Sequence, residues 1–88
     1  MLKITISKVD RNLILQHIKG LFFEDMLEVL RNAKTDNVHD DDFVCFELSS
    51  VDAHELVIGL ELKADQCRDR YMANFLRNAA ESIESYQD

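Results

Sequence analysis

Residues 10–34, DRNLILQHIKGLFFEDMLEVLRNAK, decide the fold. Apolar side chains recur there every three or four positions, at Leu15, Ile18, Phe22, Met26, Val29 and Ala33. This spacing predicts one amphipathic helix of about seven turns, capped by Asp10 and continuing through Gly20. Because so wide an apolar stripe has to be covered, we expect Phe22 in the core, where its truncation to alanine costs about 3–5 kcal/mol of folding free energy.

Alternation of apolar and polar residues predicts strands on both sides of this helix. The segments with a period of two are 2–7, 43–48 and 56–62. Serine and aspartate are frequent in residues 49–55, so we expect a turn that joins the last two strands into a hairpin. Asp65 then fits the N-cap of a second helix that includes residues 72–86.

The resulting order is strand, helix, strand, strand, helix, which predicts a single α+β domain over residues 1–88. It is the βαββα pattern of a ferredoxin-like plait that lacks its last strand. A right-handed crossover places residues 56–62 between the other two strands. Both helices then cover one face of a three-stranded antiparallel sheet.

A duplicated strand–strand–helix (ββα) unit is the alternative fold. Ser7-Lys8-Val9-Asp10 resembles Ser49-Ser50-Val51-Asp52, and the residues Leu-Arg-Asn-Ala occur at 30–33 and again at 76–79. In that case residues 13–18 form a strand and not part of a helix, since short apolar runs are ambiguous by periodicity alone.

Net charge and cysteine content limit the classes of function. Seventeen acidic residues against ten basic ones give a formal charge of −7. This charge disfavours direct contact with nucleic acid or an anionic membrane and favours a basic protein partner. No apolar run approaches the roughly 18 residues of a membrane-spanning helix. Cys45 and Cys67 form no CxxC pair, so we expect reduced thiols and a cytoplasmic location.

The acidic loop 36–42 is the main candidate for a metal site. Its possible ligands are Asp36, His39, Asp40, Asp41 and Asp42. The calcium-loop pattern, with its central glycine and terminal glutamate, is missing, and the histidine has no second ligand at zinc spacing. We therefore expect no metal and no cofactor, and keep a metal-binding or regulatory protein that uses this loop as an alternative function.

Catalysis has one weak candidate, the combination of Ser49, Ser50, Asp52 and His54. Nucleophilic catalysis needs a nucleophile, a base and an oxyanion site in fixed geometry, which one short turn rarely provides. Hydrogen bonds that form turns explain the same composition. We therefore expect no enzyme activity.

The outer face of the predicted sheet is the candidate surface for a protein partner. Its centre is apolar, its rim is charged, and Cys45 is expected opposite Gly59 of the neighbouring strand. The residues assigned to it are Phe43, Cys45, Glu47, Val57 and Glu61, with Asp40, Asp41 and Asp42 on the loop that leads into it.

The first strand is left at an edge of the sheet because the fourth strand of the plait is missing. Leu2, Ile4 and Ile6 are therefore assigned to a dimer edge, since an unpaired edge can add a strand from a second copy.

These observations predict a non-enzymatic protein-interaction module that masks a basic surface of a cytoplasmic partner protein and forms a homodimer. Inhibitors, antitoxins and phage anti-defence proteins are compact, acidic and free of motifs in the same way, an analogy of composition only. A structural subunit of a homo-oligomer is a further alternative.

Overall fold

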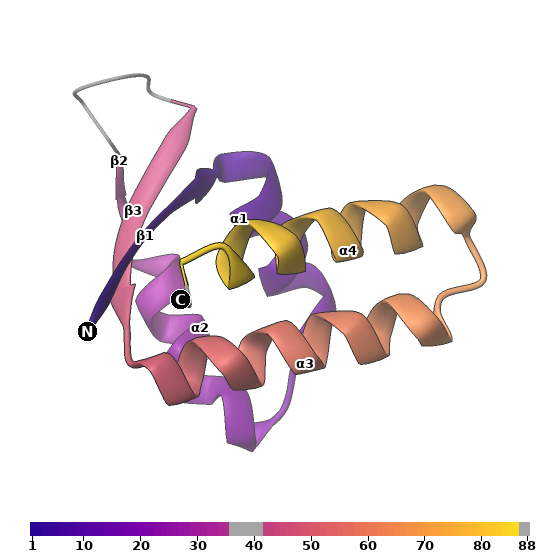
Figure 1. Ribbon diagram of the computed structural model, residues 1–88, viewed down its shortest axis with the longest axis horizontal. Coiled ribbons are helices and arrows are strands. Elements are labelled where there is room, and N and C mark those ends of the chain that lie inside the picture. The colour runs from indigo at the N-terminus through magenta and orange to yellow at the C-terminus, as the bar shows by residue number, and fades with distance from the viewer. Residues whose placement is uncertain (36–41, 87–88) are drawn as a thin grey trace.

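The computed structural model describes residues 1–35 and 42–86 as an α+β fold (Figure 1). Its elements are strand β1 (Leu2–Ser7), helix α1 (Lys8–His17), the 3-10 turn η1 (Leu21–Phe23), helix α2 (Glu24–Arg31), strand β2 (Lys34–Thr35), strand β3 (Phe43–Leu48), helix α3 (Ser50–Gln66) and helix α4 (Arg70–Glu84). The three strands form an antiparallel sheet in the order β1-β3-β2. The predicted α+β class and three-stranded antiparallel sheet are confirmed, but the βαββα order is wrong, because several elements differ from those expected.

The sheet follows the predicted alternation in β1 and β3. These strands pair from Leu2↔Leu48 to Ser7↔Phe43. The side chains on one face are buried against the helices, all of which lie on that side of the sheet (Figure 1). They are Ile4, Ile6, Val44, Phe46 and Leu48. β3 is therefore the central strand, whereas the sequence interpretation placed it at an edge.

The long helix predicted for residues 10–34 is two helices. α1 ends at His17, and Ile18 as its C-cap is already extended (φ −92°, ψ 119°). Gly20 has φ 122°, a backbone conformation that cannot continue a helix and that glycine adopts most readily. The break changes the phase of the apolar stripe, so that Phe22 is 68% exposed. The stability loss expected for Phe22→Ala therefore does not follow.

Residues 56–62 lie in helix α3, so the predicted hairpin is wrong. The hydroxyl oxygen of Ser49 accepts the N–H of Asp52 (3.1 Å) and caps the helix, which turns the presumed loop 49–55 into its first turn. The fully or nearly fully buried positions have helical spacing: Ala53, Leu56, Val57, Leu60 and Ala64. Alternation misled the interpretation because further apolar residues lie on the outer side of the same helix.

Helices α3 and α4 form an antiparallel hairpin that extends away from the sheet (Figure 1). Asp69, and not Asp65, caps α4, since its carboxylate accepts the N–H groups of Tyr71 (2.9 Å) and Met72 (3.3 Å). Asp65 lies in α3 and pairs with Arg77 of α4 at 3.1 Å. Exposed ion pairs of this kind contribute little, so buried apolar contacts hold the hairpin together.

Of the two pairs of similar segments in the sequence, only residues 7–10 and 49–52 have the same structural role. Ser7 is the last residue of β1 and Ser49 directly follows β3, and each caps the helix that follows by accepting an N–H at 3.1 Å. Residues 30–33 lie at the end of α2, whereas residues 76–79 lie inside α4. Residues 13–18 are not a strand, because α1 extends to His17. The duplicated ββα unit is therefore wrong, although the strand–serine–helix junction does occur twice.

Phe23 holds the turn between α1 and α2 against Gly59 of α3. A Cβ atom added to Gly59 lies 3.1 Å from Cζ and 3.3 Å from Cε1 of the Phe23 ring. We expect Gly59→Ala to give no stabilisation in the wild type, because the contact with the ring offsets the gain in helix propensity. In a Phe23→Ala background the same substitution should stabilise the fold by about 1 kcal/mol. Urea denaturation of the four proteins measures this coupling.

Candidate functional site

A groove of about 820 Å³ lies between helix α2 and the end of strand β3. Its lining includes Asp25, Glu28 and Val29 of α2, Lys34 of β2, and Cys45 and Glu47 of β3. β2 is only two residues long and pairs with Val44 and Cys45. The last three residues of β3 therefore have no strand beside them on this side within the described part of the chain.

The main chain of Glu47 points into this groove. The N–H of Lys8 donates to the carbonyl of Asp42 (2.8 Å), which extends the β1–β3 register by one hydrogen-bonded pair. Hydrogen-bonded and non-hydrogen-bonded pairs alternate along an antiparallel ladder, so Lys3↔Glu47 is a non-hydrogen-bonded pair. The N–H and C=O groups of Glu47 consequently face away from β1, toward the side where β2 has already ended.

Acidic side chains border the groove. Asp25 and Glu28 are exposed and three residues apart on α2, a spacing that puts them on the same side of the helix. Glu24 is paired with Arg31 at 3.6 Å, whereas no ion pair of the described residues includes Asp25, Glu28 or Glu47. Sequence reasoning missed the two α2 carboxylates because it treated their helix as a core element only. The feature of the sequence that could have identified them is the spacing of three residues between Asp25 and Glu28.

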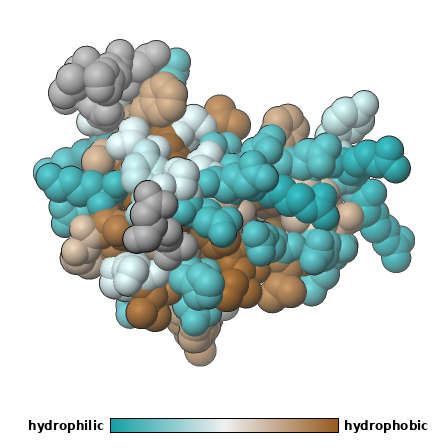
Figure 2. All heavy atoms as spheres, in the orientation of Figure 1, coloured by the Kyte–Doolittle hydropathy of each residue, from teal (hydrophilic) through white to brown (hydrophobic). Residues whose placement is uncertain are grey.

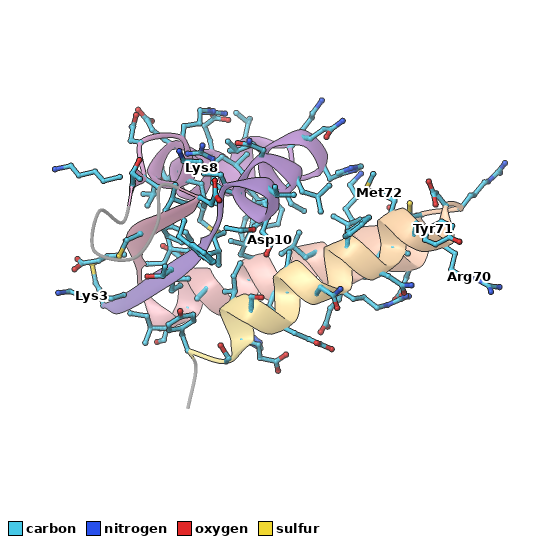
Figure 3. The ribbon with its side chains drawn as sticks, turned by 90° about the horizontal axis from the view of Figure 1, so that it is seen from above. Lys3, Lys8, Asp10, Arg70, Tyr71 and Met72 are labelled. Atoms are coloured by element: carbon cyan, nitrogen blue, oxygen red, sulfur yellow. The ribbon has the colours of Figure 1, made fainter. Side chains whose placement is uncertain are left out.

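Two lysines keep the groove from being uniformly acidic. Lys34 belongs to β2, and Lys3 stands opposite Glu47 in the register. Lys3 extends from β1 away from the helices, at the end of the molecule opposite Arg70 and Tyr71 (Figure 3). Its side chain lies on the outer face beside Glu47 and, together with Lys34, lines the groove opposite the acidic side chains of α2.

Three of the predicted partner-binding residues lie on the outer face of the sheet. Phe43 is 39% exposed, Glu47 is exposed, and Cys45 between them is half-buried. Cys45 stands opposite Thr5 and Lys34, not opposite Gly59, because Gly59 lies in α3. Their placement on this face agrees with the sequence interpretation, and their role in binding stays a prediction.

The other predicted partner-binding residues are separated from this face. Val57 is 4% exposed in the core side of α3, and Glu61 is exposed on the same helix. Both assignments to the sheet were wrong, because residues 56–62 are helical. Asp42 is exposed next to β3, and Asp40 and Asp41 lie outside the described residues.

Strand β1, which was predicted to be the dimer edge, does lie at an edge of the sheet. The main-chain groups that point outward from it, however, belong to residues other than those predicted. Leu2, Ile4 and Ile6 belong to the hydrogen-bonded pairs and direct their main chain toward β3. The outward main-chain groups are those of Lys3 and Thr5, and the carbonyl of Thr5 already accepts the Tyr86 hydroxyl (3.1 Å). A strand added at this edge therefore has to displace the C-terminal end of the described chain.

A second exposed surface is apolar and was not predicted. Leu21 is 94% exposed and Phe22 68%, both in η1, and Leu62 of α3 is 56% exposed. Phe22 packs edge-on against Phe23 at a ring-centroid distance of 5.1 Å. Figure 2 shows hydrophobic surface along the lower side of the molecule, where η1 and α3 lie. The stripe that predicted a buried Phe22 thus ends in surface residues.

Within the described residues, neither the candidate metal site nor the candidate catalytic site of the sequence analysis is formed. Among residues 1–35 and 42–86, no group of three or more histidine, cysteine, aspartate or glutamate side chains is arranged to hold a metal ion. The acidic loop lies outside these residues except for Asp42. Ser49 uses its hydroxyl to cap α3, and His54 is an exposed residue of the same helix.

No family model, curated protein or solved structure matches this chain. Within the described residues, none of the helices has the length and apolar character needed to cross a membrane. Function must therefore be inferred from the surfaces of the molecule.

Proposed function

We propose that this protein is a non-enzymatic protein-interaction module that uses the outer sheet face and the adjoining groove to bind a basic surface of a cytoplasmic partner protein. The observation that supports it best is the combination of a partly exposed aromatic side chain, Phe43, with carboxylates at Glu47, Asp25 and Glu28 that form no ion pair among the described residues. An apolar anchor within a charged rim is the usual anatomy of a protein interface.

Charge gives this surface its preference for a basic partner. The whole chain carries −7, so the long-range field attracts cationic surfaces and speeds their association. Masking of a basic surface is the mode of action of an inhibitor or antitoxin, the class we propose. Self-assembly is the second candidate, supported by the exposed apolar side chains of Leu21, Phe22 and Leu62.

The test compares three baits in affinity capture from the native host, read by quantitative mass spectrometry. Glu47→Lys places a cation on the proposed surface, and Glu61→Lys makes the same change on α3, away from it. We expect a basic protein that is captured in stoichiometric amount by wild type and Glu61→Lys, and lost with Glu47→Lys. Capture that is equal for all three baits would contradict the proposed surface.

Kinetics with the captured protein separate charge from contact. Glu47→Lys should mainly slow association, and raising the salt from 0.1 M to 1 M should do the same, since the Debye length falls from about 10 Å to 3 Å. Phe43→Ala should mainly speed dissociation, because it removes an apolar anchor. Binding that is insensitive to salt and to both substitutions would rule out this surface.

A further inference from the structure

We propose that the groove beside Glu47 binds an extended segment of the partner as an additional strand of the sheet, with apolar and basic residues alternating along that segment. This inference rests on the proposed function and specifies how the partner is held. It depends on three features of the groove: the strand edge of β3, helix α2 as the opposite wall, and the apolar and charged side chains that line the groove.

The strand edge is available for pairing. β3 runs to Leu48, but β2 accompanies it only at Val44 and Cys45. Glu47 directs its N–H and C=O groups toward this side, as the alternation of the ladder requires. Main-chain groups at a strand edge can be paired by an incoming strand, which is how peptides are bound by β-augmentation.

Helix α2 forms the second wall of the groove beside this strand edge. It packs against β3, and its residue Val29 and the following Ala33 are partly buried hydrophobic residues at the core boundary. The free volume of about 820 Å³ lies within the range of protein ligand sites. A segment in this groove therefore meets main-chain partners on one side and a helix on the other.

The lining determines which side chains the segment must carry. Side chains of a strand point alternately to its two sides, so every second one can face Val29 and Ala33. The intervening ones face the exposed rim, where Asp25, Glu28 and Glu47 have no ion-pair partner within the described part of the chain. Apolar residues fit the first set. Lysine or arginine fits the second where it meets these carboxylates, which outnumber the two lysines, Lys3 and Lys34, that also line the groove.

Strand β1 offers a contrast that makes the inference specific. It is the other edge of the sheet, but the carbonyl of Thr5 is occupied by the Tyr86 hydroxyl at 3.1 Å. The incoming segment should therefore protect the amide of Glu47 and leave that of Thr5 unchanged.

The test uses a fluorescein-labelled peptide of alternating lysine and valine, six residues long, and the full chain. We expect saturable anisotropy with a dissociation constant below about 1 mM. The double variant Asp25→Asn/Glu28→Gln should weaken binding about tenfold, whereas Glu61→Gln leaves it unchanged. A peptide N-methylated on two alternate residues keeps its charge but loses donors on one edge, and should also bind about tenfold more weakly.

Amide hydrogen exchange locates the bound peptide. At saturation the exchange of the Glu47 amide should slow about tenfold or more, while that of Thr5 stays the same. Failure of the peptide to saturate, equal binding of the N-methylated peptide, or an unprotected Glu47 amide would each overturn strand docking. Slow exchange at Glu47 in the free protein, together with a dimer in sedimentation, would also overturn it. A second copy of the chain would then occupy the strand edge.

These outcomes are distinguishable from failure of the proposed function. If the captured partner binds in a manner sensitive to Glu47→Lys but the Glu47 amide stays unprotected in that complex, the basic surface is recognised without strand pairing. If no partner is captured but the peptide slows exchange at Glu47, the groove is a strand site and the proposed function is wrong.

Discussion

Leu60→Ala is expected to lower the free energy of unfolding by about 2–5 kcal/mol, a large part of the stability of a small domain. Leu60 is 0% exposed and lies on the side of α3 that packs into the core. Removing its side chain takes away apolar contact and leaves a cavity that its neighbours can fill only in part. Urea denaturation monitored by circular dichroism measures the change.

Leu62→Ala is the matched control for this prediction. Leu62 is 56% exposed, so the same chemical change should cost less than about 1 kcal/mol. In a strand, residues 60 and 62 point to the same face and should be equally sensitive. In a helix they lie about 200° apart, so only one can be in the core. Similar losses for the two variants would contradict the helix.

Val57→Lys is expected to destabilise the fold by about 3–5 kcal/mol or to prevent folding. Val57 is 4% exposed in α3. Among the described residues the core contains no buried acidic side chain that could pair with the ammonium group. An unpaired charge at such a position is among the most costly single changes in a protein. The free energy of unfolding, or the soluble yield if folding fails, gives the result.

Ile58→Lys tests the same point with the neighbouring residue. Ile58 is 39% exposed, so a lysine there can direct its ammonium group into water and should be tolerated far better. The sequence interpretation as a strand predicts the reverse order, with Ile58 in the core and Val57 on the outer face. The ranking of the two variants therefore decides between the two interpretations even if the absolute losses are smaller than expected.

The two surfaces of the molecule support different kinds of contact. The outer sheet face and its groove combine a strand edge with acidic side chains, the basis for the basic extended partner that we propose. The surface around Leu21 and Phe22 exposes large apolar side chains, which favours self-association. Glu47→Lys affects the first surface and leaves the second intact, so the two can be studied separately.

Local patterns in the sequence determined the two main strands and the position of much of the core. Alternation in residues 2–7 and 43–48 predicted strands, and the structure has strands over these residues. Their buried residues, such as Ile4, Val44 and Phe46, followed directly. The outer-face position of Cys45 and Glu47 followed too, since successive side chains of a strand alternate.

Tertiary structure decided the elements whose sequences fit two periods. Residues 56–62 alternate, yet the cap at Ser49 and the buried set of Ala53, Val57 and Ala64 make them a helix. Gly20 interrupts a continuous apolar stripe, and the outcome depended on whether its backbone took a positive φ. The groove was beyond sequence reasoning for a related reason. It exists only because a two-residue strand ends beside a six-residue one, and strand pairing is a long-range contact that no local pattern encodes.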